Sequence, residues 1–255
     1  MISKLKFIFF LILGLLILNW VYKFFAGPES INLILENKFK LFFLVFAHIP
    51  TLYFDSLAWV VFMTKKKLSL VNAFIITWIA QTSGKFFPTG NITGEFVRIY
   101  LSIKRGMKLS EASSTVIGDL ALAAFSLLIV TIISLLFLLF SYQEFTLLKG
   151  KNIYLLFSIF ILIIFSFLFC LTIRKRYIRS ILRQSHKFIK FKLDKKFINY
   201  FLKFDYEMNL LSYRLKIVFF ALLIRMLGWL GGALEIYIFF LIIGVDVSII
   251  DVLII

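Results

Sequence analysis

The residues that could do chemistry gather in one stretch of the chain, QTSGKFFPTGNITGEFVR. Lys85 and Arg98 are cationic, while Gly90 and Gly94 lie close to the start of a predicted helix whose first turn carries Glu95. Free backbone N–H groups at a helix N-terminus attract anions, and nearby cationic side chains strengthen that attraction. The stretch therefore predicts an anion-binding site.

A structural role for the same residues stays open. The glycines could serve only to let two helices approach closely. Glu95 and Arg98 stand three residues apart, a spacing at which opposite charges pair on one helix. On this interpretation the stretch is a tight turn with no ligand.

Four more charged residues lie inside apolar segments: Asp55, Asp119, Arg225 and Glu235. Charged side chains within a membrane usually face the interior of the bundle or a water-filled cavity. Arg225 and Glu235 are roughly 15 Å apart along a helix, so each needs another partner, and Asp119 and Asp55 are candidates for Arg225. We expect these four residues to line a polar path, with a purely structural ion-pair network as the alternative.

Gly228 and Gly232 fall on the same face as Arg225 and Glu235. Small residues spaced by four let a second helix approach closely. We expect both glycines to contact a neighbouring helix.

Composition sets the class of protein. The 255 residues are 62% hydrophobic and include only 3 prolines, and no alternating polar and apolar pattern of a membrane barrel is present. We predict an all-α, polytopic integral membrane protein. The net charge of +16 fits cytoplasmic loops that meet anionic lipid rather than nucleic acid.

About five transmembrane helices are expected, with the N-terminus in the cytoplasm. They fall at residues 7–25, 41–63, 110–141, 153–173 and 217–243. Pro50 should interrupt the second span. Residues 174–216 hold thirteen Lys and Arg against three Asp and Glu, which predicts a basic cytoplasmic loop containing an amphipathic helix.

Residues 68–103 are predicted to form a re-entrant hairpin of two half-helices. Positive charge flanks this segment on both sides, so it starts and ends on the same side of the membrane. Each arm has about 12–18 helix-compatible residues, short of the ~20 that a full span needs. Two complete spans remain the alternative.

An internal repeat is suggested by LSLVNAFII, at residues 68–76, and VSIIDVLII, at residues 247–255. Internal repeats are common in membrane transporters. We therefore expect residues 1–255 to be a single membrane domain, truncated at its C-terminus and belonging to a longer protein.

No catalytic or metal-binding set emerges from the sequence, so we expect neither enzymatic activity nor a cofactor. One cysteine, Cys170, and two histidines, His48 and His186, are too few for a structural zinc site. A membrane-embedded enzyme would instead need Glu95, Asp119 and Glu235 around a bound substrate.

The motif PTGNITGEFVR, the following LSEA and the helix that bears Asp119 resemble the transmembrane region of the lysylphosphatidylglycerol synthase family, also called flippase-like domains. The later run LGWLGGALE, ending at Glu235, and GVDVS look most like the hopanoid-biosynthesis-associated branch. The resemblance implies a bacterial inner-membrane protein that moves or binds lipids, with Gly94, Glu95 and Arg98 in the membrane core. The chain departs from the family at Leu120, where an arginine is usual after the aspartate, and in the second proline- and glycine-rich re-entrant segment, which the family has and which is not found here. Because family members often stand alone without the soluble aminoacyl-transfer domain, the resemblance does not imply synthase activity.

Together these observations predict lipid translocation or lipid binding. The headgroup of an anionic phospholipid would be held by Lys85, Gly90, Gly94, Glu95 and Arg98, and no covalent chemistry is required. The alternative is a membrane scaffold that docks lipid-modifying enzymes through the basic loop. The sequence does not specify the lipid, the direction or energy source of movement, or the oligomeric state.

Overall fold

The computed structural model describes residues 11–17, 19–20, 23, 27–63, 68–86, 91–141, 154, 157–161, 163–164 and 195–254. Its described elements are all helices, which confirms the all-α class. They are α2 (Gly27–Glu36), α3 (Lys38–Phe42), α4 (Leu44–Ala47), α5 (Ile49–Phe62), α6 (Leu70–Phe86), α7 (Ile92–Lys104), α8 (Leu109–Ser141), α11 (Lys195–Tyr213), α12 (Leu215–Ile243) and α13 (Ile249–Ile254).

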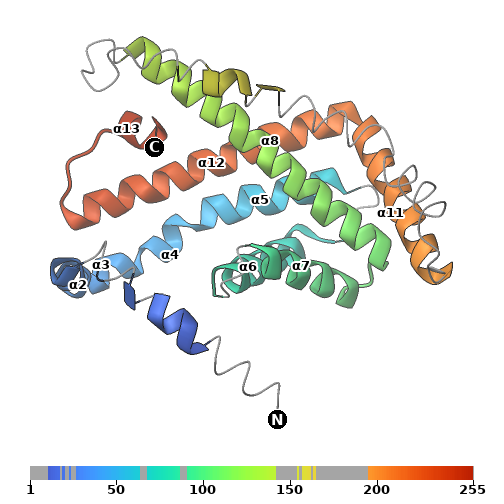
Figure 1. Ribbon diagram of the computed structural model, residues 1–255, viewed down its shortest axis with the longest axis horizontal. Helices are drawn as coiled ribbons and strands as arrows, with labels where there is room; N and C mark the ends of the chain where they lie inside the picture. The colour runs from blue at the N-terminus through green and yellow to red at the C-terminus, as the bar shows by residue number, and fades with distance from the viewer. Residues whose placement is uncertain are drawn as a thin grey trace.

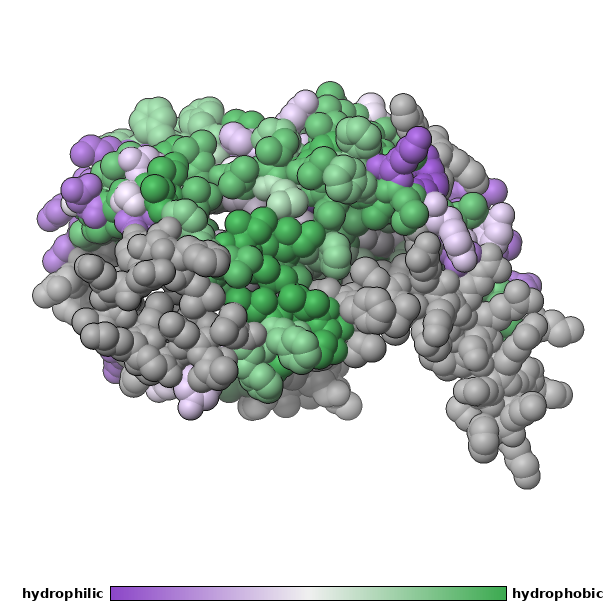
Figure 2. Space-filling model, turned by 90° about the horizontal axis from the view of Figure 1, so that it is seen from above, coloured by the Kyte–Doolittle hydropathy of each residue, from purple (hydrophilic) through white to green (hydrophobic). Residues whose placement is uncertain are grey.

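Three stretches of the described chain are long and apolar enough to cross a membrane: Lys38–Phe62, Leu109–Phe137 and Leu215–Ile243. They agree with three of the predicted spans. The two others, residues 7–25 and 153–173, are described only in part, so they stay predictions. Large hydrophobic side chains such as Phe42, Phe96 and Phe219 are exposed, and apolar residues cover much of the face in Figure 2, as a lipid-facing surface requires.

Helices α5 and α12 lie side by side and α8 crosses both, while the α6–α7 pair packs against α5 and α8 (Figure 1). The second span is interrupted as the sequence predicts. Helix α4 ends at Ala47, α5 begins at Ile49, and Pro50 occupies the first turn of α5. Proline tolerates this place because its missing N–H would have no partner in a first turn.

The hairpin consists of α6 and α7, which pack directly on each other. Their closest approach is at Gly84 and Gly94, where a Cβ added to Gly94 would lie 2.5 Å from the carbonyl oxygen of Ala80. The turn itself, residues 87–90, lies outside the described residues. The break into two short helices is confirmed, whereas re-entry into the membrane stays a prediction.

The ends of several helices meet at one end of the molecule, here called the basic end. Trp59, Met63, Ala73, Met107 and Ala112 belong to one buried cluster there, which joins α5, α6, α8 and the connection between α7 and α8. The end of α5, the start of α6 and the connection between α7 and α8 therefore lie on the same side. Residues 174–194 of the predicted basic loop lie outside the described residues, and the later part of that loop forms α11, packed on α8.

Helix α12 contacts α5 through glycines. The predicted contact is confirmed for Gly228 and is wrong for Gly232. A Cβ on Gly228 would fall 2.9 Å from Asp55 Oδ1, and one on Gly231 would fall 3.0 Å from Thr51 Oγ1. Nothing lies within 4 Å of such an atom on Gly232. The face toward α5 thus follows a spacing of three residues rather than four.

The two similar segments begin their helices in the same way. The backbone N–H of Asn72 donates to Ser69 Oγ at 3.3 Å, and that of Asp251 donates to Ser248 Oγ at 3.1 Å. Serine at this place satisfies an N–H that has no partner within the helix. This shared start supports the internal repeat.

Candidate functional site

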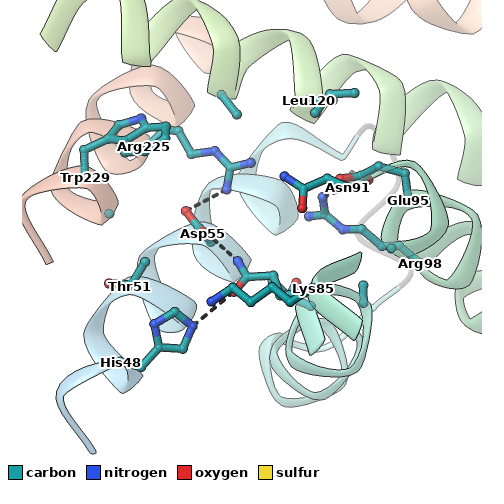
Figure 3. Close-up of a pocket in the computed structure, with 16 residues that line it drawn as sticks. His48, Thr51, Asp55, Lys85, Asn91, Glu95, Arg98, Leu120, Arg225 and Trp229 are labelled. Atoms are coloured by element: carbon teal, nitrogen blue, oxygen red, sulfur yellow. Dashed lines mark hydrogen bonds and ion pairs between the residues drawn. The ribbon is translucent and has the colours of Figure 1, made fainter. Parts of the chain in front are cut away.

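A polar cavity of about 270 Å³ lies between α5, α6, α7, α8 and α12 (Figure 3). It contains charged side chains from four of these five helices, with α8 contributing apolar residues. The lining residues are His48, Thr51, Asp55, Thr77, Ala80, Gln81, Lys85, Asn91, Gly94, Glu95, Arg98, Leu120, Ala123, Arg225, Gly228 and Trp229.

Two arginines converge on Asp119, which is completely buried behind the cavity. Asp119 Oδ2 lies 2.7 Å from Arg98 Nη1 and 3.0 Å from Arg225 Nη2. The other terminal nitrogen of Arg225, Nη1, lies 2.7 Å from Asp55 Oδ1. A buried charge is tolerated only when it is paired and hydrogen-bonded, and these contacts meet that condition for the two arginines.

Gln81 and His48 continue the network away from the arginines. Gln81 donates from Nε2 to Asp55 Oδ2 at 2.9 Å, and its Oε1 lies 3.1 Å from His48 Nε2. On the other side of the ring, His48 Nδ1 lies 2.7 Å from Glu235 Oε2. The network therefore runs from Glu235 to Arg98 through side chains of five helices and the α4–α5 junction.

The cavity lies deep in the bundle. Asp119 and Arg225 each stand ten residues from the first residue of their helices, α8 and α12, which is roughly 15 Å at 1.5 Å per residue. The hydrocarbon core of a bilayer is about 30 Å thick. If both helices cross it from the basic end, the two residues lie near its middle.

Both arginines keep N–H groups without a partner. Arg98 is 4% exposed and Arg225 is 7% exposed, yet Arg98 Nε and Nη2 and Arg225 Nε make no hydrogen bond to the described residues. The Arg98 guanidinium also lies over the Trp59 ring, 3.9 Å from its centroid, which fixes its plane. Two carboxylate oxygens, Glu95 Oε2 and Asp119 Oδ1, lack a hydrogen bond as well.

Lys85 adds a cationic side chain to the same cavity, and it forms no ion pair with any described residue. The cavity wall thus carries three cationic side chains, Lys85, Arg98 and Arg225, against Asp55 and Glu95. When Asp119 is counted with them, the formal charges cancel. The site is therefore neutral overall, with N–H groups concentrated on the arginine side.

The structure brings most of the predicted site residues together. Asp55, Lys85, Gly94, Glu95, Arg98 and Arg225 line the cavity, and Asp119 lies directly behind it. Glu235 reaches the cavity only through His48, and Gly90 lies outside the described residues. The expected partners of Arg225 are confirmed. The predicted ion pair between Glu95 and Arg98 is long, with 3.7 Å between Oε2 and Nη1. Arg98 Nη1 lies closer to Asp119 Oδ2, at 2.7 Å, so Asp119 is its stronger partner.

Sequence reasoning missed His48, Gln81 and Trp59. His48 stands seven residues, or two helical turns, before Asp55, so its place on the same face was available from the sequence. Gln81 and Trp59 gave no comparable signal. Among the described residues, no group of three His, Cys, Asp or Glu side chains is placed to hold a metal ion.

Comparison with known proteins gives one match. The family model described as the lysylphosphatidylglycerol synthase TM region matches residues 7–255. Comparisons with curated proteins and with solved structures return no match. The match covers nearly the whole chain and includes every residue of the network, while the hopanoid-associated branch stays a prediction.

Proposed function

Since this chain belongs to the lysylphosphatidylglycerol synthase TM region family, whose members have a membrane lipid-related role, we propose that it binds the headgroup of an anionic lipid in the cavity and lets it pass between leaflets. The phosphate would be held by Arg98, Arg225 and Lys85. The setting we propose is a bacterial inner membrane, with the basic end and the N-terminus in the cytoplasm.

The observation that carries this proposal is the set of unpartnered arginine N–H groups. Arg98 Nε and Nη2 and Arg225 Nε are buried and lack an acceptor among the described residues, and both arginines line the cavity. A buried donor left without an acceptor costs roughly 1–3 kcal/mol, and more when it is charged. A lipid phosphate has several oxygens that could accept from these groups, and arginine forks match phosphate geometry well.

The size of the cavity suggests which part of the lipid enters. Drug-sized ligands occupy pockets of roughly 300–1,000 Å³, so about 270 Å³ suits a headgroup and excludes two acyl chains. The chains would stay in the bilayer beside the exposed apolar side chains of the hairpin. The barrier to crossing is the desolvation of a charged phosphate, which the arginines and Lys85 would lower without any covalent step.

Lys85 offers the sharpest test because it forms no ion pair with the residues that the structure describes. The full-length protein would be reconstituted in phosphatidylcholine vesicles that contain acyl-labelled phosphatidylglycerol, and movement between leaflets would be followed by quenching of the outer label. We expect Lys85→Gln to slow movement about fivefold, the equivalent of about 1 kcal/mol for an accessible ion pair. Arg98→Ala should abolish it.

Lys104→Gln is the matched control. Lys104 lies at the opposite end of α7, away from the cavity, so its loss should leave the rate unchanged. If both Lys85→Gln and Arg98→Ala leave the rate of lipid movement unchanged, the cavity has no role in that movement. Equal movement of labelled phosphatidylcholine would show that the site does not select anionic headgroups.

A further inference from the structure

The orientation of Gln81 fixes the position of a proton on His48. Asp55 is paired with Arg225, so its carboxylate can only accept hydrogen bonds, and the amide of Gln81 must face it as a donor. The carbonyl oxygen Oε1 of Gln81 therefore faces His48 Nε2 at 3.1 Å. An oxygen that only accepts requires a donor, so His48 Nε2 carries a hydrogen.

This assignment requires a second proton on the other side of the ring. His48 Nδ1 and Glu235 Oε2 are 2.7 Å apart, a hydrogen-bond distance. If the ring were neutral with its hydrogen on Nε2 and Glu235 were ionised, two acceptors would face each other there. A hydrogen bond across this contact therefore needs one additional proton, either on the imidazole or on the carboxyl group.

The pair lies toward the end of the bundle opposite the basic end. Glu235 stands twenty residues from the start of α12, roughly 30 Å, and His48 stands roughly 20 Å from the end of α5. The side chains of His48 and Glu235 are 22% and 31% exposed, so neither is sealed inside the bundle. Lys85 of α6 lines the same cavity, and Asp55 of α5 is reached through Gln81.

We propose that the His48–Glu235 pair is a proton-binding site coupled to the anion site, so that one proton moves in the same direction as the lipid headgroup. This rests on the proposed function. The formal charges of the cavity residues and Asp119 cancel, and an ionised Glu235 adds one negative charge, so a bound phosphate brings a further negative charge that the described side chains do not compensate. A proton held nearby offsets that charge, and by linkage each ligand then strengthens the binding of the other.

The coupling step conserves charge and atoms. The proton is taken from water on one side of the membrane and shared between Nδ1 and Oε2. When it is released to water on the other side, His48 keeps its Nε2 hydrogen and Glu235 is left as a carboxylate. The two acceptors then repel each other, and the side-chain contact between Glu235 of α12 and His48 at the α4–α5 junction is lost. Histidine suits this role because its charge ordinarily changes between pH 5 and 8.

The first experiment detects the proton without any transport. Infrared difference spectra of the full-length protein in detergent would be recorded between acid and neutral pH. We expect an imidazolium or protonated-carboxyl band that disappears in Glu235→Gln and persists in Glu207→Gln, whose acid lies on α11 away from the pair. Absence of the band, or its persistence in Glu235→Gln, would overturn the assignment.

The second experiment measures coupling in vesicles that contain labelled phosphatidylglycerol and carry a pH difference of one unit. With one proton per lipid, this difference shifts the steady-state distribution between leaflets about tenfold toward the alkaline side. A protonophore, or Glu235→Gln, should remove the shift, and protein-free vesicles give the background. Movement of lipid without this shift would refute the coupling and leave the proposed function intact, whereas no movement at any pH would refute both.

Discussion

Arg98 and Asp119 join the α6–α7 hairpin to the long helix α8 by a contact of 2.7 Å between Nη1 and Oδ2. Both side chains are buried, and Arg225 of α12 shares the same oxygen at 3.0 Å. One carboxylate thus connects three helices. Its removal should affect the stability of the bundle as well as the position of the arginines.

Asp119→Asn is expected to destabilise the protein by about 3–5 kcal/mol, because two buried guanidinium groups lose their shared counter-charge. Unfolding in mixed detergent micelles, followed by circular dichroism, measures the change. Asp246→Asn is the control, since Asp246 is exposed beyond the end of α12 and should tolerate the change. Equal stability of the Asp119 variant and the wild type would contradict the central role of this carboxylate.

Gly94→Ala should push α7 away from α6. The added Cβ would lie 2.5 Å from the backbone oxygen of Ala80, which has no rotamer by which to move aside. Overpacking of this kind costs about 1–3 kcal/mol, and the shift of α7 should also reduce lipid movement because Arg98 moves with it. In Gly232→Ala nothing lies within 4 Å of the new atom, so stability should be unchanged or slightly higher.

Gln81→Glu tests the direction of the hydrogen bonds. The new carboxyl group would face Asp55 Oδ2, which accepts from Gln81 Nε2 at 2.9 Å in the wild type. A protonated carboxyl can donate to Asp55, whereas an ionised one repels it, so the stability of this variant should fall as the pH rises. Gln81→Met, similar in size but without charge, should lack this dependence. A pH profile for Gln81→Glu that matches Gln81→Met would mean that Gln81 does not donate to Asp55.

The membrane position of the hairpin can be measured by labelling cysteines. In a Cys170→Ser background, a cysteine at Ser69 or Lys104 should react with an impermeant thiol reagent from one side only, because both residues lie at the basic end. A cysteine at Phe86, near the turn, should resist the reagent from the opposite side if the hairpin is re-entrant. Its reaction from that side would show instead that α6 and α7 each cross the membrane.

The sequence alone determined the class, the broken second span and the positions of three of the five predicted spans. Runs of apolar residues between basic segments leave few alternatives for a chain in lipid, because every backbone N–H and C=O must find a partner inside its own helix. The predicted helices 110–141 and 217–243 begin within two residues of the observed α8 and α12. The sequence also singled out Asp119, Arg98 and Arg225, because charge within an apolar run is costly and therefore conspicuous.

Only the tertiary structure decided which of these charges meet. Arg98 could have paired with Glu95 on its own helix, yet its shorter contact is with Asp119 on α8, since the close packing of Gly84 on Gly94 sets the position of α7. The spacing of His48 from Asp55 places both residues on one face, but the sequence does not show that Gln81 and Glu235, which come from other helices, are the partners of His48. Their part in the network depends on how the helices pack, and the sequence of a single helix does not specify that packing.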